Sequence, residues 1–132
     1  MKLVTFLAPG HTVPMAGWLD GNLVFAAREK SMEDLIRGER GVAGEAWQVE
    51  QVTLLAPLPR PRTIRDFYAF EAHVKNARSR RGLGMIPEWY QFPVFYFSNP
   101  NAVCGQGAAV PRPRATHMLD FELEVAAVIG RE

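Results

Sequence analysis

The sequence predicts an α+β protein in which β-structure dominates. The chain opens with a strand–turn–strand pattern, in which residues 2–7 are apolar and β-prone and Asp20-Gly21 separates two further β-prone runs. A capping-box pattern over residues 31–34 predicts one short helix. Residues 118–129 alternate between polar and apolar and then become wholly apolar, which is typical of a strand that enters a core.

The composition is that of an ordinary soluble globular protein, with 132 residues, of which 48% are hydrophobic and 22% charged. A net charge of +1 argues against nucleic acid or an anionic membrane as a partner. The chain contains no apolar window of about 20 residues that could span a membrane. One cysteine, Cys104, cannot form an internal disulfide, so we expect a cytoplasmic protein.

The first part of the chain predicts a small sheet. The runs at Trp18-Leu19 and Leu23–Phe25 would form a hairpin around Asp20-Gly21. The predicted helix would end at Gly38 or Gly41, because glycine adopts the left-handed conformation that closes a helix. Residues 49–55 would return as a strand. We therefore expect a small β-rich domain over residues 1–56.

A proline-rich run over residues 56–62 predicts a domain boundary, because alternate prolines remove hydrogen-bond donors and favour extended backbone. The second domain would then cover residues 57–132. A similar Pro-Arg run occurs over residues 110–114. Both runs could instead be ligands for aromatic grooves, although connectors between packed elements explain them more simply.

The spacing of apolar residues predicts a helix from Ile64 to about Arg81, with Phe67, Phe70 and Val74 on one face. Gly82 or Gly84 would end it. The aromatic stretch over residues 88–98 predicts a loop that leads into a largely buried strand. Its rings could also stack on single-stranded nucleic acid, but a hydrophobic core explains most of them and no nucleic-acid motif is present.

Three carboxylates recur with a period of two at Asp120, Glu122 and Glu124, so a strand would place them on one face. Same-face neighbours lie roughly 6.6 Å apart, and two of them could hold one ion between them. Their oxygen ligands suit magnesium, calcium or manganese. A half-exposed acidic strand is the simpler interpretation, but the apolar run over residues 126–129 favours carboxylates with a compensating partner.

Asp66 and His73 form the second candidate pair. A spacing of seven on a helix leaves them only about 20° apart around the axis. His73 could then act as a general base beside a metal that Asp66 helps to hold, because imidazole exchanges protons near neutral pH. A histidine on a charged, solvated helix face is the alternative.

Together these features resemble the fumarylacetoacetate hydrolase family. That family carries an Asp-Phe-Tyr-x-x-x-x-His segment, seen here from Asp66 to His73, and a downstream Glu-x-Glu strand that holds a divalent ion, seen here at Glu122-Leu123-Glu124. The likeness also includes the N-terminal hairpin and three short segments, which are Leu55-Ala56-Pro57, Pro93-Val94-Phe95-Tyr96 and Leu119-Asp120-Phe121-Glu122.

The resemblance implies a role for each candidate residue. The implied metal ligands are Asp66, Glu122 and Glu124, the implied general base is His73, and the implied substrate contacts are Tyr68 and Tyr96. The family also uses an arginine that grips the substrate carboxylate. Three residues near the predicted helix end could supply it: Arg78, Arg80 and Arg81.

The resemblance also implies a fold and a reaction. The fold is a small N-terminal sheet domain followed by the first part of a mixed β-roll catalytic domain, assembled as a homodimer. The reaction is metal-dependent hydrolysis of a carbon–carbon bond in a small diketo acid, in aromatic-compound and aromatic amino acid catabolism, with Mg²⁺ as the expected ion and Ca²⁺ or Mn²⁺ as alternatives. Decarboxylation of a β-keto acid such as oxaloacetate, or hydration or isomerisation, is the runner-up within the family.

An alternative of another class is an inactive fragment or a non-catalytic binding protein. The sequence ends at Glu132, just after the Glu-x-Glu motif, whereas the family supplies a further metal-binding aspartate, a lysine and an acidic partner for the histidine from later residues. We therefore expect the 132-residue chain to be inactive by itself.

Overall fold

The structure is a computed structural model that describes residues 1–130. The chain groups into two compact units. The first unit contains residues 1–59 and the residues from 104 onward, and the second contains residues 60–103. The predicted domain boundary between residues 56 and 57 stays a prediction.

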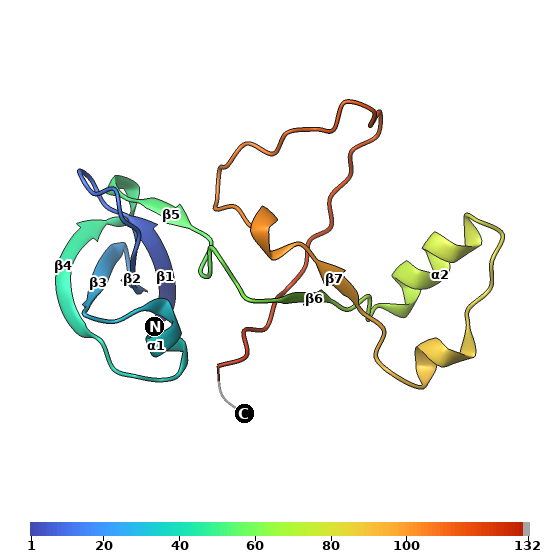
Figure 1. The fold of residues 1–132 in the computed structure, drawn as a ribbon, viewed down its shortest axis with the longest axis horizontal. Coiled ribbons are helices and arrows are strands. Elements are labelled where there is room, and N and C mark those ends of the chain that lie inside the picture. Colours follow the sequence, from blue (N-terminus) through green and yellow to red (C-terminus); the bar gives the residue numbers. More distant parts are fainter. Residues whose placement is uncertain (131–132) are drawn as a thin grey trace. The chain divides into compact units, whose positions relative to one another are not determined.

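A five-stranded antiparallel sheet forms the first unit, with the strand order β4-β3-β2-β1-β5 (Figure 1). Its strands are β1 (Lys2–Leu7), β2 (Met15–Asp20), β3 (Leu23–Arg28), β4 (Val42–Gln48) and β5 (Thr53–Leu55). The predicted hairpin between β2 and β3 is confirmed, but its two turn residues are Gly21 and Asn22, because Asp20 still pairs with Leu23. Gly21 has φ 54°, a conformation that glycine adopts without steric cost.

The largest buried cluster of this unit lies on one face of the sheet. Phe6 and Val24 are fully buried there, and Ala8 completes the buried cluster. The Trp47 ring packs against Phe6 with 5.7 Å between ring centroids. Alternation along β1 and β3 sends these side chains inward, so burial of the apolar face fixes the register of the pairing.

The short helix α1 (Met32–Ile36) packs on β1 and β2, with Met32 and Leu35 buried. The predicted capping box is confirmed. The backbone N–H of Asp34 donates to Ser31 Oγ at 3.2 Å, and the backbone N–H of Ser31 donates to Asp34 Oδ2 at 2.9 Å. Gly38, with φ 87°, follows the helix and donates to the Leu35 carbonyl at 3.0 Å.

β4 is a strand that the sequence pattern did not predict, and the predicted strand that follows it forms only in part. Residues 49–51 form a 3₁₀ turn, η1 (Val49–Gln51), and only residues 53–55 of the predicted strand pair, with β1. β4 contains small and polar residues such as Gly44 and Glu45, which have weak strand propensity. Its pairing with β3 therefore depends on the tertiary partner rather than on a local pattern.

The second unit is built around a two-stranded antiparallel ladder. The strands are β6 (Ile64–Asp66) and β7 (Tyr96–Ser98), and the chain between them contains the helix α2 (Glu71–Ser79) and the 3₁₀ turn η2 (Pro87–Tyr90). A further 3₁₀ turn, η3 (Pro100–Ala102), follows β7. Gly82, with φ 71°, comes after α2 and donates to the Ser79 carbonyl at 2.9 Å.

The prediction of one helix over residues 64–81 was wrong in its first part. Residues 64–66 form β6 and pair with β7, so the helix begins only at Glu71. The predicted buried strand in the aromatic stretch was also wrong in its burial, because Tyr96 and Phe97 in β7 are exposed. Helical spacing alone did not reveal that the first residues have a distant strand partner.

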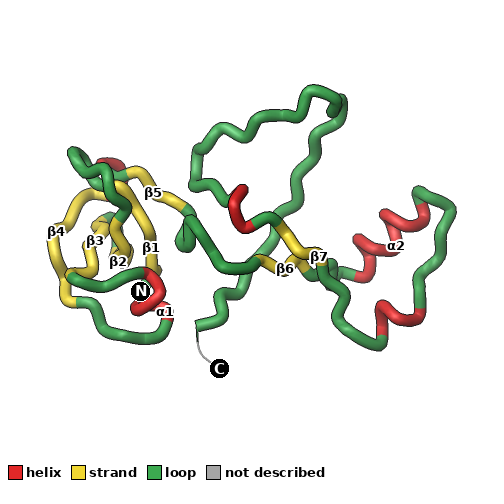
Figure 2. The backbone as a smooth tube through the Cα atoms, in the orientation of Figure 1, coloured by secondary structure: helices red, strands yellow, loops and turns green. Residues whose placement is uncertain are grey.

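The predicted strand over residues 118–129 is not formed within residues 1–130. This segment has no regular secondary structure (Figure 2), and its apolar side chains face solvent, with Leu123 95% and Val125 99% exposed. A strand needs a partner for its backbone hydrogen bonds, and no described segment pairs with this one. The alternating pattern marks strand propensity but does not supply that partner.

The regular secondary structure of the described residues is mostly β, with two α-helices, which confirms the predicted fold class in its coarse form. No helix in the described part of the chain is long and apolar enough to cross a membrane.

Replacing Phe6 with Ala should destabilise the first unit by about 3–5 kcal/mol, because the change leaves a cavity at a fully buried position. Urea denaturation followed by far-UV circular dichroism measures the loss. Val13→Ala is the control, because Val13 is 70% exposed and should change the stability by no more than about 0.5 kcal/mol. Equal losses in the two variants would show that Phe6 does not hold the core.

Candidate catalytic surface

The ladder of the second unit brings two of the predicted site residues together. Asp66, the last residue of β6, lies directly opposite Tyr96, the first residue of β7. Directly opposed residues of an antiparallel pair project from the same face, with their Cβ atoms about 4.5–5.5 Å apart. Asp66 is half-buried and Tyr96 is exposed, so the carboxylate and the phenol are both accessible to a ligand on that face.

Arg65 stabilises this ladder from the neighbouring position. Its guanidinium carbon lies 5.5 Å from the centroid of the Phe95 ring and 5.2 Å from that of Phe97. The same guanidinium donates a hydrogen bond to Thr63 Oγ1 at 3.1 Å. Each exposed cation–π contact is worth about 0.5–1 kcal/mol, so Arg65 helps to hold β6 against β7 and Asp66 opposite Tyr96.

His73 lies on α2, where it is exposed and next to the buried Val74. Asp66 and His73 do not share one helix face as predicted, because Asp66 belongs to β6. The two residues are nevertheless in the same compact unit. Their assignment as metal ligand and general base stays a prediction.

One turn of α2 is joined to η2 by a three-residue network. The Tyr90 hydroxyl donates to Glu71 Oε1 at 2.5 Å, and Lys75 Nζ lies 2.7 Å from the same oxygen. Hydrogen bonds from Lys75 and then from Tyr90 lower the pKa of the Glu71 carboxyl. The hydrogen bond to Glu71 in turn raises the pKa of both Lys75 and Tyr90. This network holds η2 close to α2.

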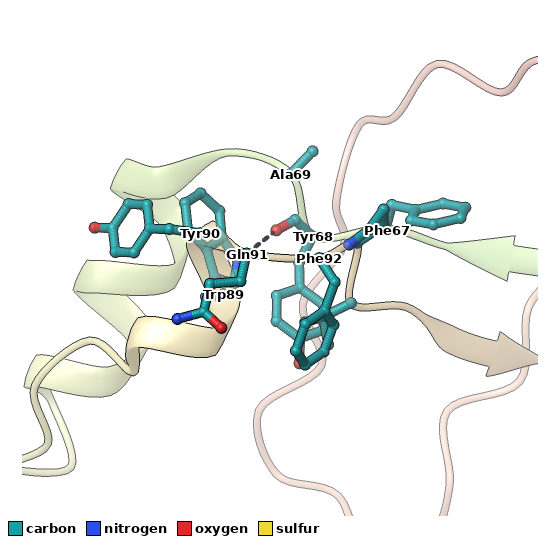
Figure 3. Close-up of a pocket in the computed structure, with 9 residues that line it drawn as sticks. Phe67, Tyr68, Ala69, Trp89, Tyr90, Gln91 and Phe92 are labelled. Carbon is teal, nitrogen blue, oxygen red and sulfur yellow. Dashed lines mark hydrogen bonds between the residues drawn. The ribbon is translucent and has the colours of Figure 1, made fainter.

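An aromatic pocket of about 340 Å³ lies between the segment that follows β6 and the segment that contains η2 (Figure 3). Tyr68, a predicted substrate contact, forms part of its wall together with Trp89 and Phe92. The prediction that the aromatic residues of this stretch form a core was wrong for these rings, which line an open pocket instead. Their density was the available signal, but it did not distinguish a buried cluster from an open one.

Arg78 is the one of the three candidate arginines that a local hydrogen bond fixes. Its Nε donates to the Gly84 carbonyl at 2.5 Å, which ties the loop after α2 to the helix. Arg80 ends the helix and Arg81 follows it, and both are exposed. A contact between one of these three arginines and a substrate carboxylate stays a prediction.

Glu122 and Glu124 belong to the other unit, in the irregular segment after residue 104. Both are exposed. The three predicted ligands are thus divided between the units, with Asp66 in the second. Among residues 1–130, no group of three or more His, Cys, Asp or Glu side chains is close enough together to hold a metal ion.

The chemistry of the predicted donor set nevertheless fits a hard divalent cation. Asp66, Glu122 and Glu124 offer only carboxylate oxygens, which are the ligands that Mg²⁺, Mn²⁺ and Ca²⁺ prefer. None of the three side chains is buried. Each carboxylate is therefore accessible to an ion from solvent without a rearrangement that would first have to expose it.

Comparison with known proteins identifies the family. Residues 62–132, just over half of the chain, match the model for the C-terminal domain of fumarylacetoacetate (FAA) hydrolase. The chain belongs to the fumarylacetoacetate hydrolase family. The matched range includes all six predicted site residues of the chain, from Asp66 to Glu124.

Three curated relatives in the fumarylacetoacetate hydrolase family are named fumarylacetoacetase. The protein of Arabidopsis thaliana is 26% identical over 98% of this chain and 34% of its own length. That of Dictyostelium discoideum is 29% identical over 64% of the chain and 24% of its length, and that of Oryza sativa subsp. japonica is 30% identical over 53% and 21%. The chain thus spans at most about a third of these relatives. No solved structure matches it.

Lowering the pH below about 4.5 should weaken the second unit, because the pKa of Glu71 is depressed from 4.5 in the folded state. A depressed carboxyl pKa gives stability that is present above the unfolded value and is lost as the pH falls through the folded value. Glu71→Gln removes this contribution. Urea denaturation at pH 6 and pH 3, followed by tryptophan fluorescence, should show a smaller acid loss in this variant than in the parent.

The matched control for this experiment is Glu88→Gln, which removes an exposed carboxyl from η2 itself. It should lose stability with acid as the parent does. If Glu71→Gln also behaves like the parent, the network does not hold η2 to α2.

Proposed function

We propose that this chain supplies part of a metal-dependent hydrolase that cleaves a carbon–carbon bond in a small diketo acid. The family match over residues 62–132 is the observation that carries the proposal. The pairing of Asp66 with Tyr96 supports it, because a carboxylate and a phenol on one accessible face suit an oxygen-rich substrate. The finer fold, in which residues 57–132 begin a mixed β-roll catalytic domain, and assembly as a homodimer belong to the same proposal.

In this proposal Asp66, Glu122 and Glu124 hold a divalent ion, with Mg²⁺ as the first candidate. When bound, the ion would supply Lewis-acid polarisation of the substrate's carbonyl oxygens and would stabilise the negative charge that develops during cleavage. Tyr68 and Tyr96 would orient the substrate through their phenol groups. An arginine at the end of α2 would bind the substrate carboxylate through its guanidinium.

His73 would act as the general base. A ring nitrogen of His73 accepts a proton from water, and the water oxygen forms a bond to the carbonyl carbon next to the bond that is cleaved. The bond from this carbon to its neighbour then breaks, and the electron pair leaves with the departing carbon. His73 then transfers its proton to the departing carbon. The products are a carboxylic acid and a shorter keto acid.

Metal binding by the carboxylates can be tested on this chain directly. Calorimetric titration with Mg²⁺ and Mn²⁺ should show binding by the parent chain and its loss in a Glu122→Ala/Glu124→Ala double variant, because two of three ligands are removed. The control double variant is Glu45→Ala/Glu50→Ala, which removes two exposed carboxylates of the first unit that lie outside the proposed ligand set. Equal binding by both double variants would contradict the ligand assignment.

Turnover tests the reaction. A family-length protein that carries these residues should hydrolyse a 2,4-diketo acid, and His73→Gln should lower kcat by about 10²–10⁴-fold, the usual contribution of a general base. Oxaloacetate, assayed in parallel, distinguishes decarboxylation from hydrolysis. Asn76→Ala, on the exposed surface of the same helix, is the control and should retain activity. Full activity of His73→Gln would exclude His73 as the base.

A further inference from the structure

The aromatic pocket of the second unit has a size that suits a small organic group. Its volume is about 340 Å³, within the range of about 300–1,000 Å³ that is usual for ligand sites. An apolar cavity of about 150 Å³ is enough to hold benzene. The pocket therefore has room for one ring and several atoms attached to it.

The walls of this pocket are mainly aromatic, and much of that ring surface is exposed. Phe92 is 55% and Tyr90 58% exposed, and Trp89 is half-buried. Covering exposed aromatic surface with an apolar ligand is favourable, and stacking of the ligand on a ring adds to the gain. A flat ligand would gain from both effects.

The polar atoms of the two central rings are already used inside the protein. The Trp89 indole N–H donates to the Tyr68 carbonyl at 3.2 Å, shown by the dashed line in Figure 3. The Tyr90 hydroxyl donates to Glu71. Trp89 and Tyr90 also pack edge to face, with centroids 4.9 Å apart and planes at 87°. These bonds fix the rings, so a ligand meets the carbon faces of Trp89 and Tyr90 rather than their polar atoms, while the rest of the wall, which includes Gln91, is mixed in polarity.

Tyr68 links the pocket to the proposed reaction. Its side chain lines the pocket, while Asp66, two residues earlier, lies opposite Tyr96 on the ladder. A substrate held at Asp66 and Tyr68 by its oxygen atoms would extend a neighbouring group toward Trp89 and Phe92. The pocket would then determine which substrates bind, according to the group that they place in it.

We propose that this pocket is a specificity subsite that binds an aryl ring carried by the keto acid substrate. The inference rests on the proposed function for the identity of the rest of the substrate. Phe92 and Trp89 are the specificity-determining residues in it. A substrate with a small saturated group in place of the ring would leave the pocket unfilled.

The three tryptophans of the chain provide a direct test, because two of them, Trp18 and Trp47, belong to the other unit. In a ¹⁵N–¹H NMR titration, 2,4-dioxo-4-phenylbutanoate should shift the indole resonance of Trp89 and leave those of Trp18 and Trp47 in place. Trp89→Phe identifies the resonance by its loss. The methyl analogue 2,4-dioxopentanoate should need a concentration at least about fivefold higher for the same shift.

Phe92→Leu supplies the second arm, because it removes an exposed ring with little effect on folding. It should weaken binding of the phenyl compound by about two- to twelvefold, the equivalent of one aromatic pair, and leave binding of the methyl compound unchanged. Phe70→Leu is the matched control, because Phe70 is an 82% exposed ring of the same unit outside the pocket. It should bind both compounds as the parent does.

Equal binding of the phenyl and methyl compounds, or equal effects of Phe92→Leu and Phe70→Leu, would overturn the subsite. This readout does not depend on turnover. A selective shift of Trp89 supports the subsite even when no diketo acid is hydrolysed, a result that would instead defeat the proposed function. Hydrolysis with no preference for the phenyl compound would defeat the subsite and leave the proposed function standing.

Discussion

The short antiparallel pairing of β6 with β7 is the constraint on which the candidate site depends. Three residue pairs join segments that are far apart in the sequence, and one of these pairs sets Asp66 opposite Tyr96. Closing a loop of this length costs conformational entropy, and the hydrogen bonds of a three-residue ladder offset only part of that cost. Arg65, placed against the rings of Phe95 and Phe97, adds contacts at the same place. Loss of this pairing would separate the carboxylate from the phenol.

The second unit combines a well-satisfied polar network with exposed aromatic rings. Glu71, Lys75 and Tyr90 satisfy one another, and the Trp89 N–H has a backbone partner. Rings whose polar atoms are engaged still expose carbon to water, which is unfavourable unless a ligand covers it. The exposed rings lie within residues 62–132, the range that matches the model for the C-terminal domain of fumarylacetoacetate (FAA) hydrolase.

Local chemistry made some features predictable. The hairpin of β2 and β3 and the capping box of α1 are determined by neighbouring residues, and both were predicted. The strand β6 was mistaken for helix, because Phe67 and Phe70 happened to recur at helical spacing. Of the candidate site, the residue types and their order were available from the sequence, but the juxtaposition of Asp66 with Tyr96 was not, because it depends on a pairing between distant segments.

The sequence by itself determined the mostly-β character, the small N-terminal sheet and membership of the fumarylacetoacetate hydrolase family, because periodicity, turn chemistry and ordered motifs are local properties. Only the tertiary structure decided that the aromatic rings around Trp89 line an open pocket and that Glu122 and Glu124 lie in a segment without strand partners. Burial and strand pairing both require a second surface. A residue pattern can favour such a surface, but only the folded chain shows whether it is present.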